Sequence, residues 1–111
     1  MAAGDVVIVQ DVTLRDGTKG DFRILTGTVV LDGGNPTPIA LANYLSAIDG
    51  AVVSMEGSAA PGADPSAVTS AISGTTLNVY AWKITAVGDA TLIASTNNAR
   101  LVNWIAMGPK A

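Results

Sequence analysis

The chain contains no cysteine and no histidine. The absence of cysteine excludes a disulfide framework, a thiolate metal site and a cysteine nucleophile. The absence of histidine removes the commonest general base and the commonest metal ligand, and with them a Ser-His-Asp triad. A Ser-Lys pair stays formally open. We therefore expect a protein that is not an enzyme and that carries no metal or cofactor.

Charge is scarce as well. Charged residues make up 14% of the chain, whereas about 25% is usual in soluble domains. The six Lys and Arg residues are scattered, without a basic patch interleaved with aromatic residues, so direct nucleic-acid binding is not expected. Hydrophobic residues reach 49%, and the mean hydropathy is +0.41. This excess favours a surface that other subunits partly cover over one built only of Thr, Ser, Asn and Gly.

Long apolar runs are missing too. None approaches the roughly 20 residues that a membrane-spanning helix needs, so no membrane association is expected. Residues 1–10 have neither the basic segment nor the long apolar core of a signal peptide, and we expect the protein to be made and used without secretion. Most of the nine Asp and Glu residues fall in turn-like segments, where Asp bonds to nearby backbone. A glycosidase-like carboxylate pair stays open, because the sequence does not give distances in space.

The strongest positive feature is a β-favouring run at residues 75–86, Thr-Thr-Leu-Asn-Val-Tyr-Ala-Trp-Lys-Ile-Thr-Ala. Branched and aromatic side chains dominate it, and they suit a pleated sheet. Because side chains alternate along a strand, Leu77 and Val79 share one face, and Tyr80 and Trp82 share the other. Both faces are therefore largely apolar. The run predicts either a central strand covered on both sides or a strand with one core face and one partner-binding face.

Shorter segments with the same character lie between turn signals. They predict strands at residues 5–12, 22–32, 51–56, 66–73, 91–95 and 100–107. A helix is the alternative for 66–73, but we prefer a strand because Ser73-Gly74 can turn it directly into the next strand as a hairpin. Gly27 is expected to mark a bend or bulge. Residues 32–38 contain two prolines, which predict a loop and exclude a central strand.

This pattern predicts an all-β fold, specifically a small antiparallel β-sandwich or barrel. Residues 39–48 have mixed periodicity, and we expect at most one or two short helical turns there. With 111 residues, the chain is interpreted as a single β domain, 1–111, with a short N-terminal arm of about residues 1–9. Trp104 is expected in the core. Trp82 stays open between a core residue, a sugar-stacking residue and an interface anchor.

Six short motifs are spread across most of the chain: Gly-Thr-Val-Val-Leu-Asp-Gly at 27–33, Asn-Pro-Thr-Pro at 35–38, Gly-Ala-Val-Val-Ser at 50–54, Pro-Gly at 61–62, Val-Tyr-Ala-Trp-Lys at 79–83 and Val-Asn-Trp-Ile-Ala at 102–106. In these motifs the chain resembles the capsid cement, or decoration, proteins of tailed bacteriophages. It implies a homotrimeric β protein that binds the outer surface of the phage head and bridges major capsid proteins. Such a protein is assembled in the host bacterial cytoplasm and ends in the virion.

Under this interpretation, part of the apolar excess contacts other subunits. We expect contacts in the first strand and on one face of the 75–86 strand; the candidate interface residues are Val6, Val7, Ile8, Val9, Tyr80 and Trp82. The alternative is a phage tail or fibre module, with carbohydrate binding as one function, motivated by Tyr80 and Trp82. The head-binding role needs no cofactor and no catalytic residue.

Overall fold

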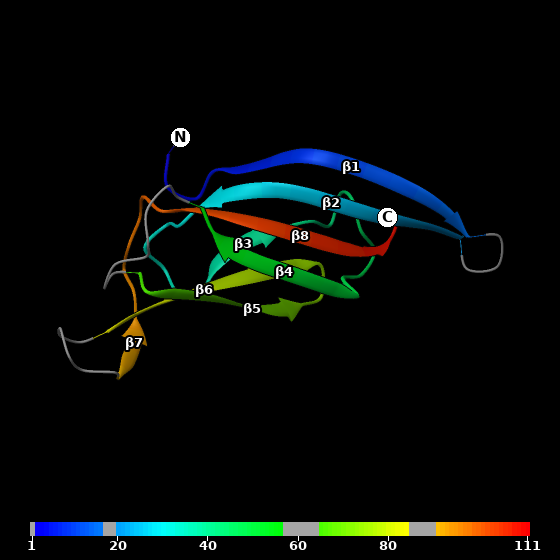
Figure 1. Ribbon diagram of the computed structural model, residues 1–111. Helices are drawn as coiled ribbons and strands as arrows, with labels where there is room; N and C mark the ends of the chain where they lie inside the picture. The colour runs from blue at the N-terminus through cyan, green and yellow to red at the C-terminus, as the bar shows by residue number, and fades with distance from the viewer. Residues whose placement is uncertain (1, 17–19, 57–64, 85–90) are drawn as a thin grey trace.

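Figure 1 shows a computed structural model of the chain, which describes residues 2–16, 20–56, 65–84 and 91–111. Within these residues all regular structure is β, and no helix is present. The strands are β1 (Val6–Asp16), β2 (Gly20–Val30), β3 (Thr37–Ala40), β4 (Gly50–Met55), β5 (Ala67–Ser73), β6 (Thr76–Ile84), β7 (Leu92–Ala94) and β8 (Leu101–Pro109). The predicted all-β fold is confirmed.

The strands form two antiparallel sheets that pack face to face. Sheet A has the order β1-β2-β8-β4, and sheet B has the order β3-β6-β5. The short strand β7 pairs with β6 beyond the end of β3, so β3 and β7 follow one edge of β6 in succession. On the other side, β5 of sheet B contacts β4 of sheet A. The architecture is consistent with a small β-sandwich (Figure 1).

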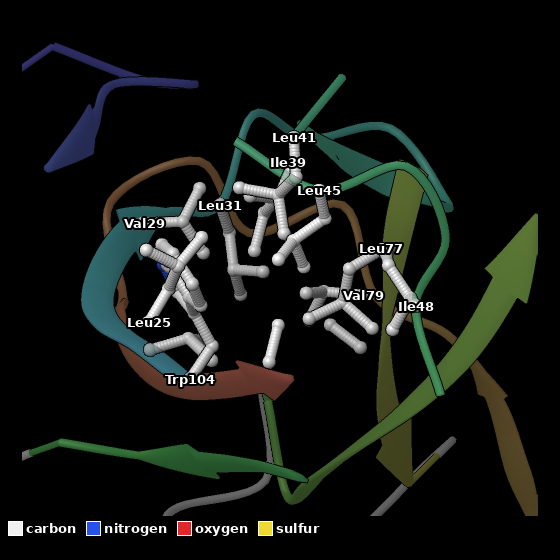
Figure 2. Close-up of a cluster of buried hydrophobic side chains, with 13 residues drawn as sticks. Leu25, Val29, Leu31, Ile39, Leu41, Leu45, Ile48, Leu77, Val79 and Trp104 are labelled. Atoms are coloured by element: carbon white, nitrogen blue, oxygen red, sulfur yellow. The ribbon is translucent and has the colours of Figure 1, made fainter. Parts of the chain in front are cut away.

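The core lies between the sheets and is built by strict alternation along the strands. Val102, Trp104 and Ala106 of β8 are fully or almost fully buried, which confirms the core position expected for Trp104. Leu77 and Val79 meet them from sheet B (Figure 2). The remaining buried members of the cluster are Leu25, Val29, Leu31, Ile39, Leu41, Leu45, Ile48 and Ala81. Four of these come from the segment 39–48, which closes one end of the sandwich.

Gly27 makes room for the largest core side chain. It lies opposite Trp104 on the neighbouring strand, and a Cβ added to it would stand 2.6 Å from Cζ2 of the indole. The same Cβ would also meet the carbonyl oxygen of Val7. The irregularity expected at Gly27 is found on the partner strand, where the β1 register shifts between Ile8 and Gln10. The close approach therefore explains why no side chain is present at this position.

The β1–β2 hairpin is longer than predicted and gives the molecule its shape. β1 continues to Asp16, four residues past the predicted end, and β2 starts at Gly20. The radius of gyration is 15.2 Å, and the long axis measures 53 Å. A compact domain of this size has a radius of gyration of about 13 Å. The hairpin extends the long axis, as Figure 1 shows.

One strand was missed. Residues 37–40 form β3, although Pro38 belonged to a predicted loop. Proline has no N–H to donate, and β3 is tolerated because it is an edge strand with a single partner, β6. The exclusion from a central position was right. In the segment 39–48, one turn forms through a hydrogen bond from Leu45 N to Leu41 O of 2.9 Å, and no helix follows.

The predicted hairpin at residues 66–84 is confirmed. β5 pairs with β6 from Ala67 opposite Trp82 to Ser73 opposite Thr76, and Gly74 provides the turn with a φ of 61°. The helix alternative for this segment is wrong. The strand predicted at 91–95 is shorter, and residues 85–86 of the predicted 75–86 strand lie outside the described residues.

Candidate functional site: exposed apolar surfaces

The polar chemistry of the described residues is sparse. No three Asp or Glu side chains among them gather into a group that could hold a metal ion. No helix in this part of the chain could cross a membrane. The described surface instead has large apolar areas, and the exposed apolar side chains gather on a strand edge and on the outer faces of the sheets.

The first predicted interface segment, Val6 to Val9, belongs to the edge strand β1. Val6 is 39%, Val7 41% and Val9 61% exposed. Ile8 differs, because it lies opposite Gly27 on the core side and packs against the core cluster. Three of the four side chains are thus accessible to a partner. Their role in an interface stays a prediction.

The second predicted pair, Tyr80 and Trp82, lies on the outer face of sheet B. Their buried neighbours Leu77, Val79 and Ala81 point into the core, so the alternate positions face outward. The Tyr80 and Trp82 rings stack at 6.5 Å between centroids with an interplanar angle of 27°. Both residues are half-buried. They lie on the opposite sheet from Val6–Val9, so the fold does not bring the two predicted groups together.

The Trp82 ring is held in place by a neighbouring strand. Its Nε1 donates a hydrogen bond of 2.9 Å to Oγ1 of Thr69 on β5. Trp82 lies opposite two small outward residues, Ala67 on β5 and Ala94 on β7, whereas the next outward residue of β7, Leu92, is large and 49% exposed. The small neighbours leave the Trp82 ring accessible from outside, which suits stacking against a flat ligand or insertion into a partner.

A larger apolar surface was not identified from the sequence. It covers the outer face of sheet A, where aligned positions of all four strands carry apolar side chains. We call it the outer apolar band, and it consists of Val12, Leu14, Phe22, Ile24, Val52, Ile105, Met107 and Pro109. Val12 pairs with Ile24 and Ile24 with Met107, while Ile105 pairs with Val52 in the adjacent row. The exposed fractions are 45% for Val12, 49% for Leu14, 60% for Val52 and 40% for Ile105.

The band has a polar continuation along the same face. Thr26, Thr28, Asn103 and Ser54 occupy the aligned positions toward the other end of the sheet. The sequence contained part of the evidence for the band, because Ile105 and Met107 alternate with Trp104 along the strand and so lie on the opposite face. Once Trp104 is placed in the core, these residues must face outward. The strand order, which brings Val52 and Val12 onto the same face, was not accessible.

Arg23 anchors the hairpin to the rest of the molecule. Its Nε lies 2.7 Å from Oδ1 of Asp11 on β1. Its guanidinium group lies 5.7 Å from the centroid of the Tyr44 ring and donates a hydrogen bond of 3.1 Å to the Tyr44 carbonyl oxygen. One side chain thus connects both hairpin strands to the turn at 42–45.

Asn35 performs a similar task for sheet B. Its side-chain Nδ2 donates to the Ala81 carbonyl oxygen at 2.8 Å, and its Oδ1 accepts from Ala81 N at 3.0 Å. Ala81 lies on β6 between the segment paired with β3 and the segment paired with β7. The amide group therefore replaces a missing strand residue at this point of the sheet edge.

We expect Asn35→Ala to lower the free energy of unfolding by about 1–3 kcal/mol, because the N–H of the buried Ala81 loses its partner. Chemical denaturation measures the change. Asn43→Ala, at an exposed turn position, is the matched control and should stay within about 0.5 kcal/mol of the parent. Equal losses in the two variants would contradict the role of Asn35.

Together, the fold and these surfaces define a protein consistent with a small β-sandwich, with an exposed apolar face on sheet A, an aromatic pair on the outer face of sheet B and an exposed apolar edge. A scan of protein-family models and searches of curated proteins and of solved structures found no match to this chain.

Proposed function

We propose that this chain is a structural virion protein, a capsid cement or decoration protein that binds the outer surface of a tailed-phage head and bridges neighbouring major capsid proteins. The observation that carries the proposal is the outer apolar band. The inner side of sheet A already packs the core, so an apolar outer side serves no purpose within the described chain. A surface of this kind is typical of one that another protein covers. The sequence resemblance supplies the identity of that protein.

Bridging is a matter of buried area and rigidity, and it requires no catalytic group. A standard interface covers about 800 Å² on each partner. The band lies on four hydrogen-bonded strands, which resist deformation when neighbouring subunits pull apart. In this proposal the protein assembles in the bacterial cytoplasm and resists the pressure of packaged DNA from outside the head. The homotrimer that the resemblance implies stays a prediction.

The proposal predicts that a charge in the band weakens head binding. Ile105→Asp places a carboxylate opposite Val52, in the row of the band that borders its polar continuation, where burial would remove its hydration. We expect at least a tenfold rise in the dissociation constant, about 1.4 kcal/mol, for heads prepared without this protein. Co-sedimentation of the purified protein with such heads measures it.

The control is Ala99→Asp, which adds the same charge at an exposed bend before β8, outside the band and outside the predicted interface residues. It should bind heads like the parent protein. Equal binding by Ile105→Asp and the parent would remove the band from the interface. Failure of the parent to bind heads at all, with binding to tails instead, would refute the cement function.

The Tyr80–Trp82 pair favours a second candidate, a tail or fibre module that binds carbohydrate. Two stacked, half-buried rings on the outer face of a sheet are the kind of surface on which a sugar ring packs. A glycan array tests this function directly. Binding that is lost in Tyr80→Ser, with no affinity for heads, would favour the second candidate over the first.

A further inference from the structure

The strand β1 has an open edge. Among the described residues it pairs only with β2, and nothing lies along its other side (Figure 1). The opposite edge of sheet A is different, because β4 contacts β5. The open edge leaves a row of backbone N–H and C=O groups that only water or another strand can satisfy.

Protein edges that stay unpaired usually carry protection, such as a proline, a lysine or a bulge. β1 contains neither proline nor lysine. Its register shift lies between Ile8 and Gln10, so the segment 10–16 after it is regular. Within that segment Val12 and Leu14 are nearly half exposed. This part of β1 is therefore a regular edge with an apolar outer face, and the charged residues Asp11 and Arg15 on its inner face restrict which strand can pair with it.

The charges of this segment are complementary to those of a second, antiparallel copy of the same segment. Asp11 and Arg15 share the inner-face parity of β1, since they align with Leu25 and Asp21 of β2. Thr13 lies midway between them. When the segment meets an antiparallel copy with Thr13 opposite Thr13, Asp11 of each chain faces Arg15 of the other. On the outer face the same register places Val12 opposite Leu14.

We propose that β1 pairs with β1 of a second copy of this chain, antiparallel and centred on Thr13, so that two four-stranded sheets become one continuous sheet. A two-fold axis normal to the sheet keeps the inner and outer faces of the copies aligned. It also joins the outer apolar bands of the two copies through the Val12–Leu14 pairs. This goes beyond the cement function, which needs no particular number of subunits.

Other registers are less favourable. Centring the pair on Asp11 opposes two carboxylates, and centring it on Val12 or Leu14 leaves Asp11 and Arg15 without a charged partner in the other copy, although Asp11 keeps its ion pair with Arg23. A closed trimer cannot use this contact, because an isologous surface joins two copies only. The edge thus argues for two copies where the sequence resemblance implied three.

The absence of cysteine from the chain allows a direct test with a single introduced thiol. In the proposed dimer the two Thr13 Cβ atoms lie about 5 Å apart, close to the spacing of a disulfide. The two Gln10 residues are offset by six positions, which is about 20 Å. Both side chains are exposed on β1. We expect Thr13→Cys to form a disulfide-linked dimer at least tenfold faster than Gln10→Cys under mild oxidation.

A second variant tests the same contact without covalent chemistry. Thr13→Asp places a carboxylate opposite Arg23 within the chain, which preserves the fold, but opposite another carboxylate in the dimer. We expect the dissociation constant of the dimer to rise roughly tenfold by light scattering, with Thr13→Ser as the unchanged control. A monomer at millimolar concentration, a trimer, or equal cross-linking of the two cysteine variants would overturn the proposal. No heads are used, so the result is independent of the cement function.

Discussion

Trp104→Ala should lower the free energy of unfolding by about 3–5 kcal/mol. The side chain is 1% exposed and is the largest of the fully buried side chains. Truncation removes its contacts with both sheets and leaves a cavity that strands fixed by hydrogen bonds cannot close. Domains of this size have a total stability of about 5–15 kcal/mol, so much of it would be lost. Denaturation followed by circular dichroism measures the change, because the variant loses a fluorophore.

Trp104→Phe provides the comparison. Phenylalanine keeps most of the ring contact, and it removes Nε1, which is buried without a hydrogen-bond partner in the described part of the chain. We expect a loss of about 1–2 kcal/mol, well below that of alanine. An alanine variant that loses less than its phenylalanine counterpart would mean that Trp104 does not organise the core.

Gly27→Ala should also destabilise the protein, although it adds only one carbon atom. The new Cβ would stand 2.6 Å and 2.8 Å from two indole atoms of Trp104 and would also meet the carbonyl oxygen of Val7. A backbone oxygen within a hydrogen-bonded strand pair cannot move away easily. We expect a loss of about 1–3 kcal/mol in the free energy of unfolding. Hydrogen exchange should also speed up at the amides of residues 6–8 as β1 is displaced.

Gly50→Ala is the matched control in the same sheet. The nearest atoms to its added Cβ belong to the flexible Met107 side chain, 3.8 Å and 4.0 Å away. Neither glycine has a positive φ, so the two differ in space and not in backbone strain. We expect Gly50→Ala to be neutral or to stabilise by about 0.4–1 kcal/mol. If both variants behaved alike, packing against Trp104 would not explain Gly27.

Much of the fold prediction was based on the alternation of side chains between the two faces of a strand. Because a strand places neighbouring side chains on opposite sides, Leu77 and Val79 could be grouped on one face of 75–86 and Tyr80 and Trp82 on the other, and Trp104 was expected in the core. Which face of 75–86 is buried stayed open. Proline chemistry correctly kept 32–38 out of a central position but concealed the edge strand β3. A strand that contains Pro38 can form at the edge of a sheet, where it has one neighbouring strand, but not in the centre, where it has two. The position of the strand in the sheet is a property of the tertiary structure.

The interface residues show a similar limit. When both faces of a strand are apolar, one face packs in the core and a further element or a partner must cover the other face. The sequence does not show which face packs in the core, because that depends on which strands become neighbours. The outer apolar band consists of residues that are far apart in the chain, such as Val12, Val52 and Ile105, and only the strand order places them together.

By itself, then, the sequence determined the β class, the alternation that buries Trp104, and the lack of thiol and imidazole chemistry, since each follows from residue type and nearest neighbours along the chain. The tertiary structure decided which faces are covered, that β1 is an open edge, and that Tyr80 and Val6–Val9 lie on different sheets. Strand order and register bring together residues distant in sequence, and the free energy that selects them comes from long-range packing that local patterns do not encode.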